Sequence, residues 1–278
     1  MLLVIALFAQ IVTTLSQDGA KAMREQRFAD AEKVYRELVK REPANPLWHM
    51  NLGLALHSAG RYAEALPEFT TFLKAKPAPG PIHLVAALAQ LKLNKPCEAV
   101  PLLEKARQWN AEKTLVELGD AYAGCGQREP AAQAYEAALS TPAKSKEIAR
   151  HAAHNYWLAR SYGKARPLFA SVASDYARDP DFLYEYGDTL VREQGPEAGI
   201  PPLLKAYEYA PDRLPARAEL GKALLAVDRA AEAIPHLEAA APQDSTLLLP
   251  LSRAYKAVGR TADAAKAQEE YRKKVGAQ

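Results

Sequence analysis

The sequence predicts an all-α fold built from repeated helical hairpins. Between residues 47 and 77, apolar residues recur at steps of three and four, which is the period of a helix and not of a strand. The residues Ser-Ala-Gly-Arg at positions 58–61 interrupt this pattern, and Pro77 closes it. We therefore expect two amphipathic helices joined by a short turn, and most of the remaining chain has the same pattern.

A small residue near the start of each expected second helix marks the repeat. The markers are Ala31, Ala65, Ala99, Ala131, Ala165, Gly199, Ala233 and Ala264. They follow one another at steps of 34, 34, 32, 34, 34, 34 and 31 residues, so eight hairpins are expected in nearly constant register.

Two further positions keep a fixed distance from each marker. Twelve residues before it stands a small residue, in order Gly19, Gly53, Ala87, Gly119, Ala153, Gly187, Gly221 and Ser252. Four residues after it stands a large residue, in order Tyr35, Phe69, Leu103, Tyr135, Phe169, Leu203 and Leu237, whereas the last repeat has Gln268. Small side chains at these places are expected to let paired helices approach closely.

Prolines lie two residues after five of the markers. They are Pro67, Pro101, Pro167, Pro201 and Pro235. If each second helix begins four residues before its proline, the amide hydrogen that proline lacks has no acceptor within the helix, and the residue costs little there.

This pattern resembles the tetratricopeptide repeat. The residues that carry the resemblance are Leu52, Gly53, Gly60, Tyr62, Ala65, Phe69 and Pro77, and again Leu118, Gly119, Tyr122, Gly126, Ala131, Tyr135 and Ala138. The resemblance covers residues 17–278 and implies a right-handed α-solenoid, a superhelix of about eight stacked helix-turn-helix repeats. The expected repeats span about 17–45, 46–79, 80–111, 112–145, 146–179, 180–213, 214–244 and 245–278.

Composition and motifs exclude several classes of function. The 278-residue chain is 49% apolar and 25% charged with a formal net charge of +3, which predicts a core-forming protein and no nucleic-acid partner. It contains no P-loop, no GxGxxG, no HExxH and no motif for a nucleophilic serine or cysteine. The sequence therefore predicts no enzymatic activity and no cofactor.

The N-terminus has the pattern of a secretory signal. Residues 2–9 are apolar without interruption, no charge precedes Asp18, and Thr14 and Ser16 are small enough to allow cleavage before Gln17. We expect residues 1–16 to be a signal peptide and the protein to be periplasmic or secreted. No Lys or Arg precedes the apolar run, so an apolar first helix buried in a cytoplasmic protein stays an alternative. Membrane contact is expected only if this segment is retained as a tether.

The resemblance also implies where a partner would bind. In this family the first helix of each pair lines a concave groove that receives peptides. Residues three before, one after and four after the small first-helix residue are expected to point into it, and the candidates are Met50, Leu54, Leu84, Leu88, Asp120, Arg150, His154, Trp157, Tyr184, Asp188, Lys222 and Arg253. Such a groove is apolar in its first half and charged or aromatic in its second.

Two interpretations of these groove residues stay open. A partner segment could be anchored on them, with Trp157 and Tyr184 as aromatic anchors. Alternatively, the early leucines pack against adjacent repeats and bind nothing. Family members that hold acidic C-terminal peptides use lysines, asparagines and an arginine on the first groove helices, where only Asn51 fits here, which argues against that ligand.

The leading prediction is a non-enzymatic scaffold that binds a protein or peptide partner, and two alternatives belong to other classes. His151 and His154 lie three residues apart and could bind zinc in a metal-dependent hydrolase, with Asp120 or Asp188 from a neighbouring helix as a third ligand. The second alternative is a structural subunit that associates with copies of itself.

The two cysteines are expected to lie at the same pole of neighbouring repeats. Cys97 starts one second helix and Cys125 ends the next first helix. In an exported protein they could form a disulfide between repeats. Two unpaired thiols are the alternative.

Overall fold

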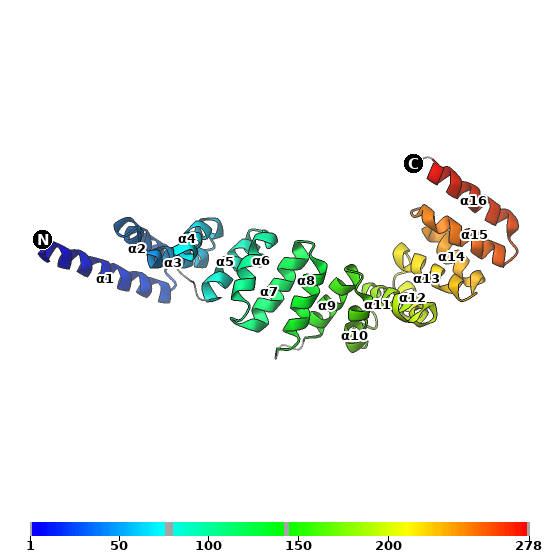
Figure 1. Cartoon of the computed structure of the whole chain (residues 1–278), viewed down its shortest axis with the longest axis horizontal. Coiled ribbons are helices and arrows are strands. Elements are labelled where there is room, and N and C mark those ends of the chain that lie inside the picture. Colours follow the sequence, from blue (N-terminus) through cyan, green and yellow to red (C-terminus); the bar gives the residue numbers. More distant parts are fainter. Residues whose placement is uncertain (1, 76–79, 142–144, 277–278) are drawn as a thin grey trace. The chain divides into compact units, whose positions relative to one another are not determined.

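The structure is a computed structural model that describes residues 2–75, 80–141 and 145–276. Met1, the first residue of the expected signal peptide, and Pro77, which closes the helical pattern of residues 47–77, lie outside these residues. The chain divides into two compact units, Met1–Lys144 and Ser145–Gln278. The described residues form α-helices and one short 3-10 helix, η1, and no strand (Figure 1).

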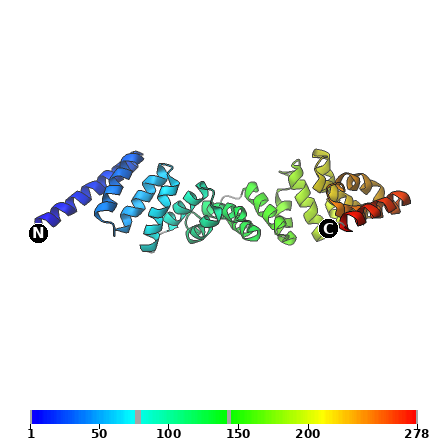
Figure 2. The ribbon, with the colours of Figure 1, turned by 90° about the horizontal axis from the view of Figure 1, so that it is seen from above.

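The described residues of the first unit form eight helices. They are α1 (Leu2–Arg24), α2 (Phe28–Arg41), α3 (Pro46–Ser58), α4 (Tyr62–Ala75), α5 (Gly80–Lys92), α6 (Pro96–Ala106), α7 (Ala111–Gly124) and α8 (Arg128–Ala138). Consecutive helices pair as hairpins, beginning with α1–α2, and each hairpin packs on the next (Figure 2).

The second unit is organised in the same way. Its helices are α9 (Lys146–Leu158), α10 (Tyr162–Val172), α11 (Pro180–Gln194), α12 (Pro196–Tyr209), α13 (Leu214–Ala226), α14 (Ala230–Ala240), η1 (Ser245–Leu247), α15 (Leu248–Ala257) and α16 (Thr261–Gly276). Both units are therefore stacks of helical hairpins, and the predicted all-α solenoid of helical repeats is confirmed.

The small and large residues of the repeat meet inside each hairpin. A Cβ atom added to Gly119 would lie 2.6 Å from the ring of Tyr135, and one added to Gly221 would lie 2.8 Å from Leu237 Cγ. The alanine markers named above are fully buried. In the last hairpin, Ser252 donates a hydrogen bond of 2.9 Å to the backbone oxygen of the marker Ala264. The predicted close approach of paired helices is confirmed.

The turn within each hairpin uses a residue with a left-handed backbone. These residues are Gln26, Gly60, Asn94, Gly126, Arg160, Gly195, Asp228 and Gly259, with φ between 56° and 101°. This conformation reverses the chain after the first helix, and glycine adopts it without the steric cost that other residues bear.

The expectation about the prolines is wrong. α4 begins at Tyr62, five residues before Pro67, and the other four prolines stand equally deep in their helices. The carbonyl four residues earlier therefore lies inside the helix and receives no hydrogen bond from proline. All five prolines are exposed, so the interrupted side of each helix faces solvent and not the core.

The N-terminal helix is longer than its partner. α1 has 23 residues and α2 has 14, and Figure 1 shows α1 projecting beyond α2. Leu7 and Phe8 are exposed, whereas Val12 and Leu15 pack against the first hydrophobic cluster of the unit. Packing of this helix against the array is thus observed for Val12 and Leu15, and cleavage before Gln17 stays a prediction. Among the described residues, no helix combines the length and apolar character that a membrane crossing requires.

Candidate functional site

The first helices of successive hairpins lie next to one another on one side of each unit. α3 contacts α5 in the first unit, and α9 contacts α11, α11 contacts α13 and α13 contacts α15 in the second. In the described part of the chain, second helices do not pack on one another to this extent. The first helices therefore line the inner side of each stack, and we call the surface that they form the inner face.

In the first unit, the candidate residues on the inner face are mostly part of the packing. Leu84 is buried, and Met50, Leu54 and Leu88 are half-buried against the hydrophobic clusters of the unit. These four side chains support the packing interpretation more than a ligand. Asp120 is exposed, and its Oδ1 accepts a hydrogen bond of 2.5 Å from the Tyr135 hydroxyl.

Asp120 also influences its titratable neighbours. Burial and the hydrogen bond to Asp120 raise the pKa of Tyr135. Burial, together with the negative charge of Asp120, raises the pKa of Glu117. This corner of the first unit is therefore acidic. Asp120 is the charged residue among the candidate positions on that unit's inner face.

In the second unit, the structure joins the candidate residues into a polar network. His154 Nδ1 lies 2.9 Å from Glu185 Oε1. Trp157 donates from Nε1 to Asp188 Oδ2 over 2.8 Å, and Arg192 donates from Nε to Asp188 Oδ1 over 3.2 Å. The network runs across α9 and α11 and binds each first helix to the next.

Three more ion pairs lie at the ends of this network. Arg150 Nη2 lies 2.9 Å from Asp179 Oδ2, where Asp179 is also the N-cap residue of α11. Lys222 is paired with Glu219 one turn earlier on α13. Arg192 reaches the same Glu219 over 3.6 Å.

Acidic and basic side chains occupy different depths in this network. The side chains of Asp188 and Glu185 are 7% and 9% exposed, while those of Arg192 and Lys222 are 46% and 40% exposed. The two carboxylates thus lie in the floor. Arg192, which pairs with Asp188, and Lys222, which pairs with Glu219, reach solvent. A molecule that approaches this face meets positive groups first.

The two aromatic candidates are in contact. The rings of Trp157 and Tyr184 meet edge to face with centroids 5.7 Å apart, and the guanidinium of Arg213 lies 5.0 Å from the centroid of the Tyr184 ring. Burial raises the pKa of Tyr184, and the nearby charge of Asp188 adds to this. Both rings are half-buried, so part of their surface serves the stack and part is open.

Two pockets adjoin along α13 and share Lys222. The first has a volume of ≈ 320 Å³ and is lined by Tyr184, Glu219 and Asp244 among others. The second has a volume of ≈ 510 Å³ and is lined by Lys222, Leu225, Ala226, Pro250 and Arg253. Both fall in the size range of ligand sites. The candidates Tyr184, Lys222 and Arg253 are thereby brought to one surface of the second unit.

A further pocket of ≈ 360 Å³ lies between α14, α15 and α16. Most charged groups at its rim are compensated within the protein: Arg260 pairs with Glu238 and Asp263, and Lys274 pairs with Glu270, whereas Lys266 makes no ion pair among the described residues. Its chemistry points to no particular partner.

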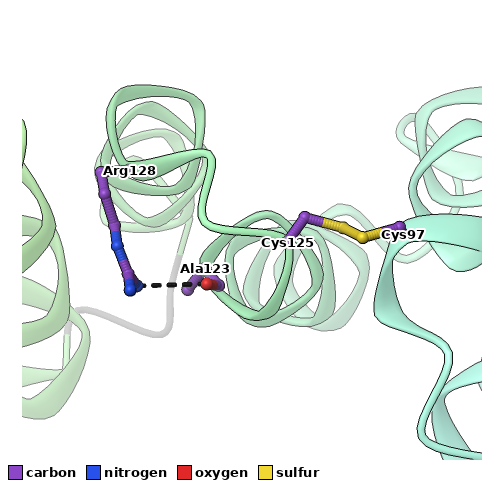
Figure 3. Close-up of a disulfide and its surroundings, with 4 residues drawn as sticks. All are labelled: Cys97, Ala123, Cys125 and Arg128. Atoms are coloured by element: carbon purple, nitrogen blue, oxygen red, sulfur yellow. Dashed lines mark hydrogen bonds between the residues drawn. A yellow bond between two sulfur atoms is a disulfide. The ribbon is translucent and has the colours of Figure 1, made fainter.

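Cys97 and Cys125 are joined by a disulfide (Figure 3). Their Cα atoms are 5.3 Å apart, and the bond connects the start of α6 to the end of α7. On its other side, the end of α7 accepts a hydrogen bond of 3.1 Å from Arg128 to the backbone oxygen of Ala123 (Figure 3). The end of this first helix is thus held by both neighbouring second helices.

Comparison with known proteins identifies the repeat. Two family models described as tetratricopeptide repeat match residues 21–80 and 112–144. The chain contains tetratricopeptide repeats. No curated protein matches it in sequence.

Solved tetratricopeptide repeat structures share its fold. YrrB, described as a TPR protein with an unusual peptide-binding site, is 20% identical with a TM-score of 0.53, and the match covers 62% of this chain and 91% of YrrB. The C-terminal part of a TPR repeat-containing protein from Cytophaga hutchinsonii is 18% identical with a TM-score of 0.55, covering 80% and 94%. MamA AMB-1 is 20% identical with a TM-score of 0.51, covering 59% and 91%. At these identities the likeness concerns the fold alone, and tetratricopeptide repeats as a class form protein-interaction scaffolds.

The tetratricopeptide repeat arrangement does not gather metal ligands around the two histidines. Within the described residues, no group of three His, Cys, Asp or Glu side chains is arranged to hold a metal ion. Asp188, one of the two residues considered as a third ligand, bonds to Trp157 and Arg192, and the carboxylate next to His154 is that of Glu185. The hydrolase alternative has no structural observation in its favour.

Apart from Asp188, the acidic side chains in the floor of this tetratricopeptide repeat surface were not predicted from the sequence. Glu185 and Glu219 lie two residues before the small residues of α11 and α13, a position that was not considered. One signal was present: Asp188 and Arg192 are four residues apart, and Glu219 and Lys222 three apart, the spacings at which charges pair on a helix. The contacts of His154 and Trp157 across to α11 had no such signal.

Proposed function

We propose that the chain is a non-enzymatic scaffold that holds a segment of another protein on the inner face of its second unit. One observation carries this proposal: the two adjoining pockets that share Lys222 and reach Arg253. The corresponding surface of the first unit is filled by its own half-buried leucines, so the second unit is the better site.

The surface is suited to binding because it is already formed. The ion pairs and hydrogen bonds of the network fix His154, Trp157 and Arg192 before a partner arrives. Little side-chain entropy is then lost on association, and more of the contact energy is retained as affinity. Open aromatic surface beside cations is also typical of residues that dominate binding energy.

Site-specific photo-cross-linking tests this proposal. A benzophenone amino acid replaces Ala226, which is exposed and lines the larger pocket, in cells that produce the protein. The matched control replaces Ala231, an exposed alanine on the second helix α14. We expect a discrete cross-linked protein from position 226 only. Equal products from both positions, or none from position 226, would contradict the proposal.

We further propose that the protein works in an oxidising compartment outside the cytoplasm, periplasmic or secreted. The disulfide between Cys97 and Cys125 supports this, because cytosolic proteins seldom keep structural disulfides. The apolar run at the N-terminus agrees with export. To test this, cells are quenched with acid and fractionated, and free thiols are treated with an alkylating mass tag. The protein in the extracytoplasmic fraction should carry no tag. Protein carrying two tags without prior reduction would refute this compartment.

A further inference from the structure

The larger pocket on the inner face has an apolar floor and a basic wall. It lies between the second half of α13 and the start of α15. Leu225, Ala226 and Pro250 supply apolar surface, and Lys222 and Arg253 supply cations from two different helices. A pocket of this composition favours an apolar group that has a negative charge beside it.

The two cations are not equally engaged within the protein. Lys222 is paired with Glu219. The side chain of Arg253 is exposed and makes neither an ion pair nor a hydrogen bond among the residues that the structure describes, and the same holds for Lys256 one turn later on α15. The positive charge of α15 at this edge of the pocket is therefore uncompensated by the chain itself.

We propose that this pocket binds an apolar side chain from an internal segment of a partner protein, with an acidic side chain beside it that pairs with Arg253. This inference rests on the proposed function and specifies the chemistry of the partner at that same surface. The occupant is a peptide segment whose charge complements the uncompensated arginine.

The neighbouring pocket argues for an internal segment over a chain terminus. Because both pockets contact Lys222, a segment that fills the larger one can continue along α13 into the smaller one. Glu219 and Asp244 also line the smaller pocket, and Lys222, the one cation in its lining, is paired with Glu219, so this pocket offers no uncompensated cation to a second acidic residue. The acidic residue is thus required only at the Arg253 end of the bound segment.

Short fluorescent peptides test this chemistry. Three peptides are acetylated and amidated, so that no terminal charge is present, and differ in one residue: Leu-Glu-Leu, Leu-Gln-Leu or Leu-Lys-Leu within the same Gly-Ser frame. Fluorescence anisotropy at low salt should show that the Glu peptide binds about two- to five-fold more tightly than the Gln peptide, the size of one exposed ion pair. The Lys peptide should bind most weakly.

Arg253→Glu should reverse this order, so that the Lys peptide becomes the tightest. Arg178→Glu is the control, because Arg178 is an exposed arginine of the same unit between α10 and α11 and the change in net charge is identical. Circular dichroism verifies that both variants keep the helical fold. An unchanged order in Arg253→Glu, an equal reversal in Arg178→Glu, or no binding of the Glu peptide overturns the inference.

The outcome also separates this inference from the function on which it rests. If the cross-link at position 226 forms but Arg253→Glu leaves the peptide order unchanged, the scaffold stands and the acidic partner does not. If light scattering shows an oligomer that Arg253→Glu dissociates while no peptide binds, the occupant is a second copy of this chain and the inference is wrong.

Discussion

The ring of Phe69 lies directly against the backbone of Gly53, so that a Cβ atom on Gly53 would be 2.7 Å from Phe69 Cε1. Phe69 is 1% exposed and cannot swing into solvent. The same contact recurs as Gly19 with Tyr35 and as Gly187 with Leu203. It joins residues sixteen apart and sets the distance between the helices of a hairpin.

Gly53→Ala should therefore destabilise the first unit. Overpacking costs about 1–3 kcal/mol in a filled core, and the better helix propensity of alanine returns at most about 1 kcal/mol. Urea unfolding followed by circular dichroism measures the difference. Unchanged stability of Gly53→Ala would show that the ring shifts without cost.

Removing the disulfide should loosen the first unit only. The bond closes a loop with a sequence separation of 28, for which chain entropy predicts a loss of about 3.5 kcal/mol in the free energy of unfolding. Replacing Cys97 and Cys125 together by serine leaves no free thiol, and a reductant should then have no further effect. Hydrogen exchange should increase in α6 and α7 and stay unchanged in α13. A uniform increase through both units would contradict this local role.

The fold could be predicted from the sequence because its determinants are periodic. The glycine and the large residue that meet inside a hairpin stand sixteen residues apart in successive repeats, and such a regular pattern is visible without coordinates. The five prolines show the limit of this reasoning. Their spacing was recognised, but their depth in the helix depends on where each helix begins, which spacing alone does not fix.

The site was less accessible to prediction. Spacing placed Tyr184, Lys222 and Arg253 on the first helices, and the structure gathers them at adjoining pockets. The partners of His154 and Trp157 lie 31 residues away on α11, and such pairing depends on how neighbouring helices cross. For the same reason, burial of Leu84 could not be distinguished from exposure in a groove.

Mild acid should destabilise the second unit through His236. Burial lowers the pKa of this imidazole, and the nearby charge of Arg217 adds to the effect. A lowered pKa in the folded state means that its contribution to stability is present above the unfolded value near 6.5 and is lost as the pH falls through the folded value. His236→Phe keeps an aromatic ring against Tyr207, whose ring centroid is 4.7 Å away, and removes the titration. Between about pH 7 and pH 5, the urea midpoint of His236→Phe should fall less steeply than that of the wild type. Equal slopes of midpoint against pH in the two proteins would exclude His236 as a cause.

Replacing Asp188 should be far more costly than replacing Asp120. Both occupy the same position of their repeats, but the Asp188 carboxylate is buried beneath Trp157 and Arg192, whereas Asp120 is exposed. Asp188→Ala removes the acceptor of two donors, the half-buried Trp157 and the partly exposed Arg192, and should lower the free energy of unfolding by about 2–4 kcal/mol. Asp120→Ala removes one accessible hydrogen bond and should cost about 1 kcal/mol. Asp188→Asn keeps an acceptor oxygen for Trp157 without the charge and should fall between the two. Urea unfolding of the three variants decides the matter, and similar losses for Asp188→Ala and Asp120→Ala would mean that the acidic floor does not bind α9 to α11.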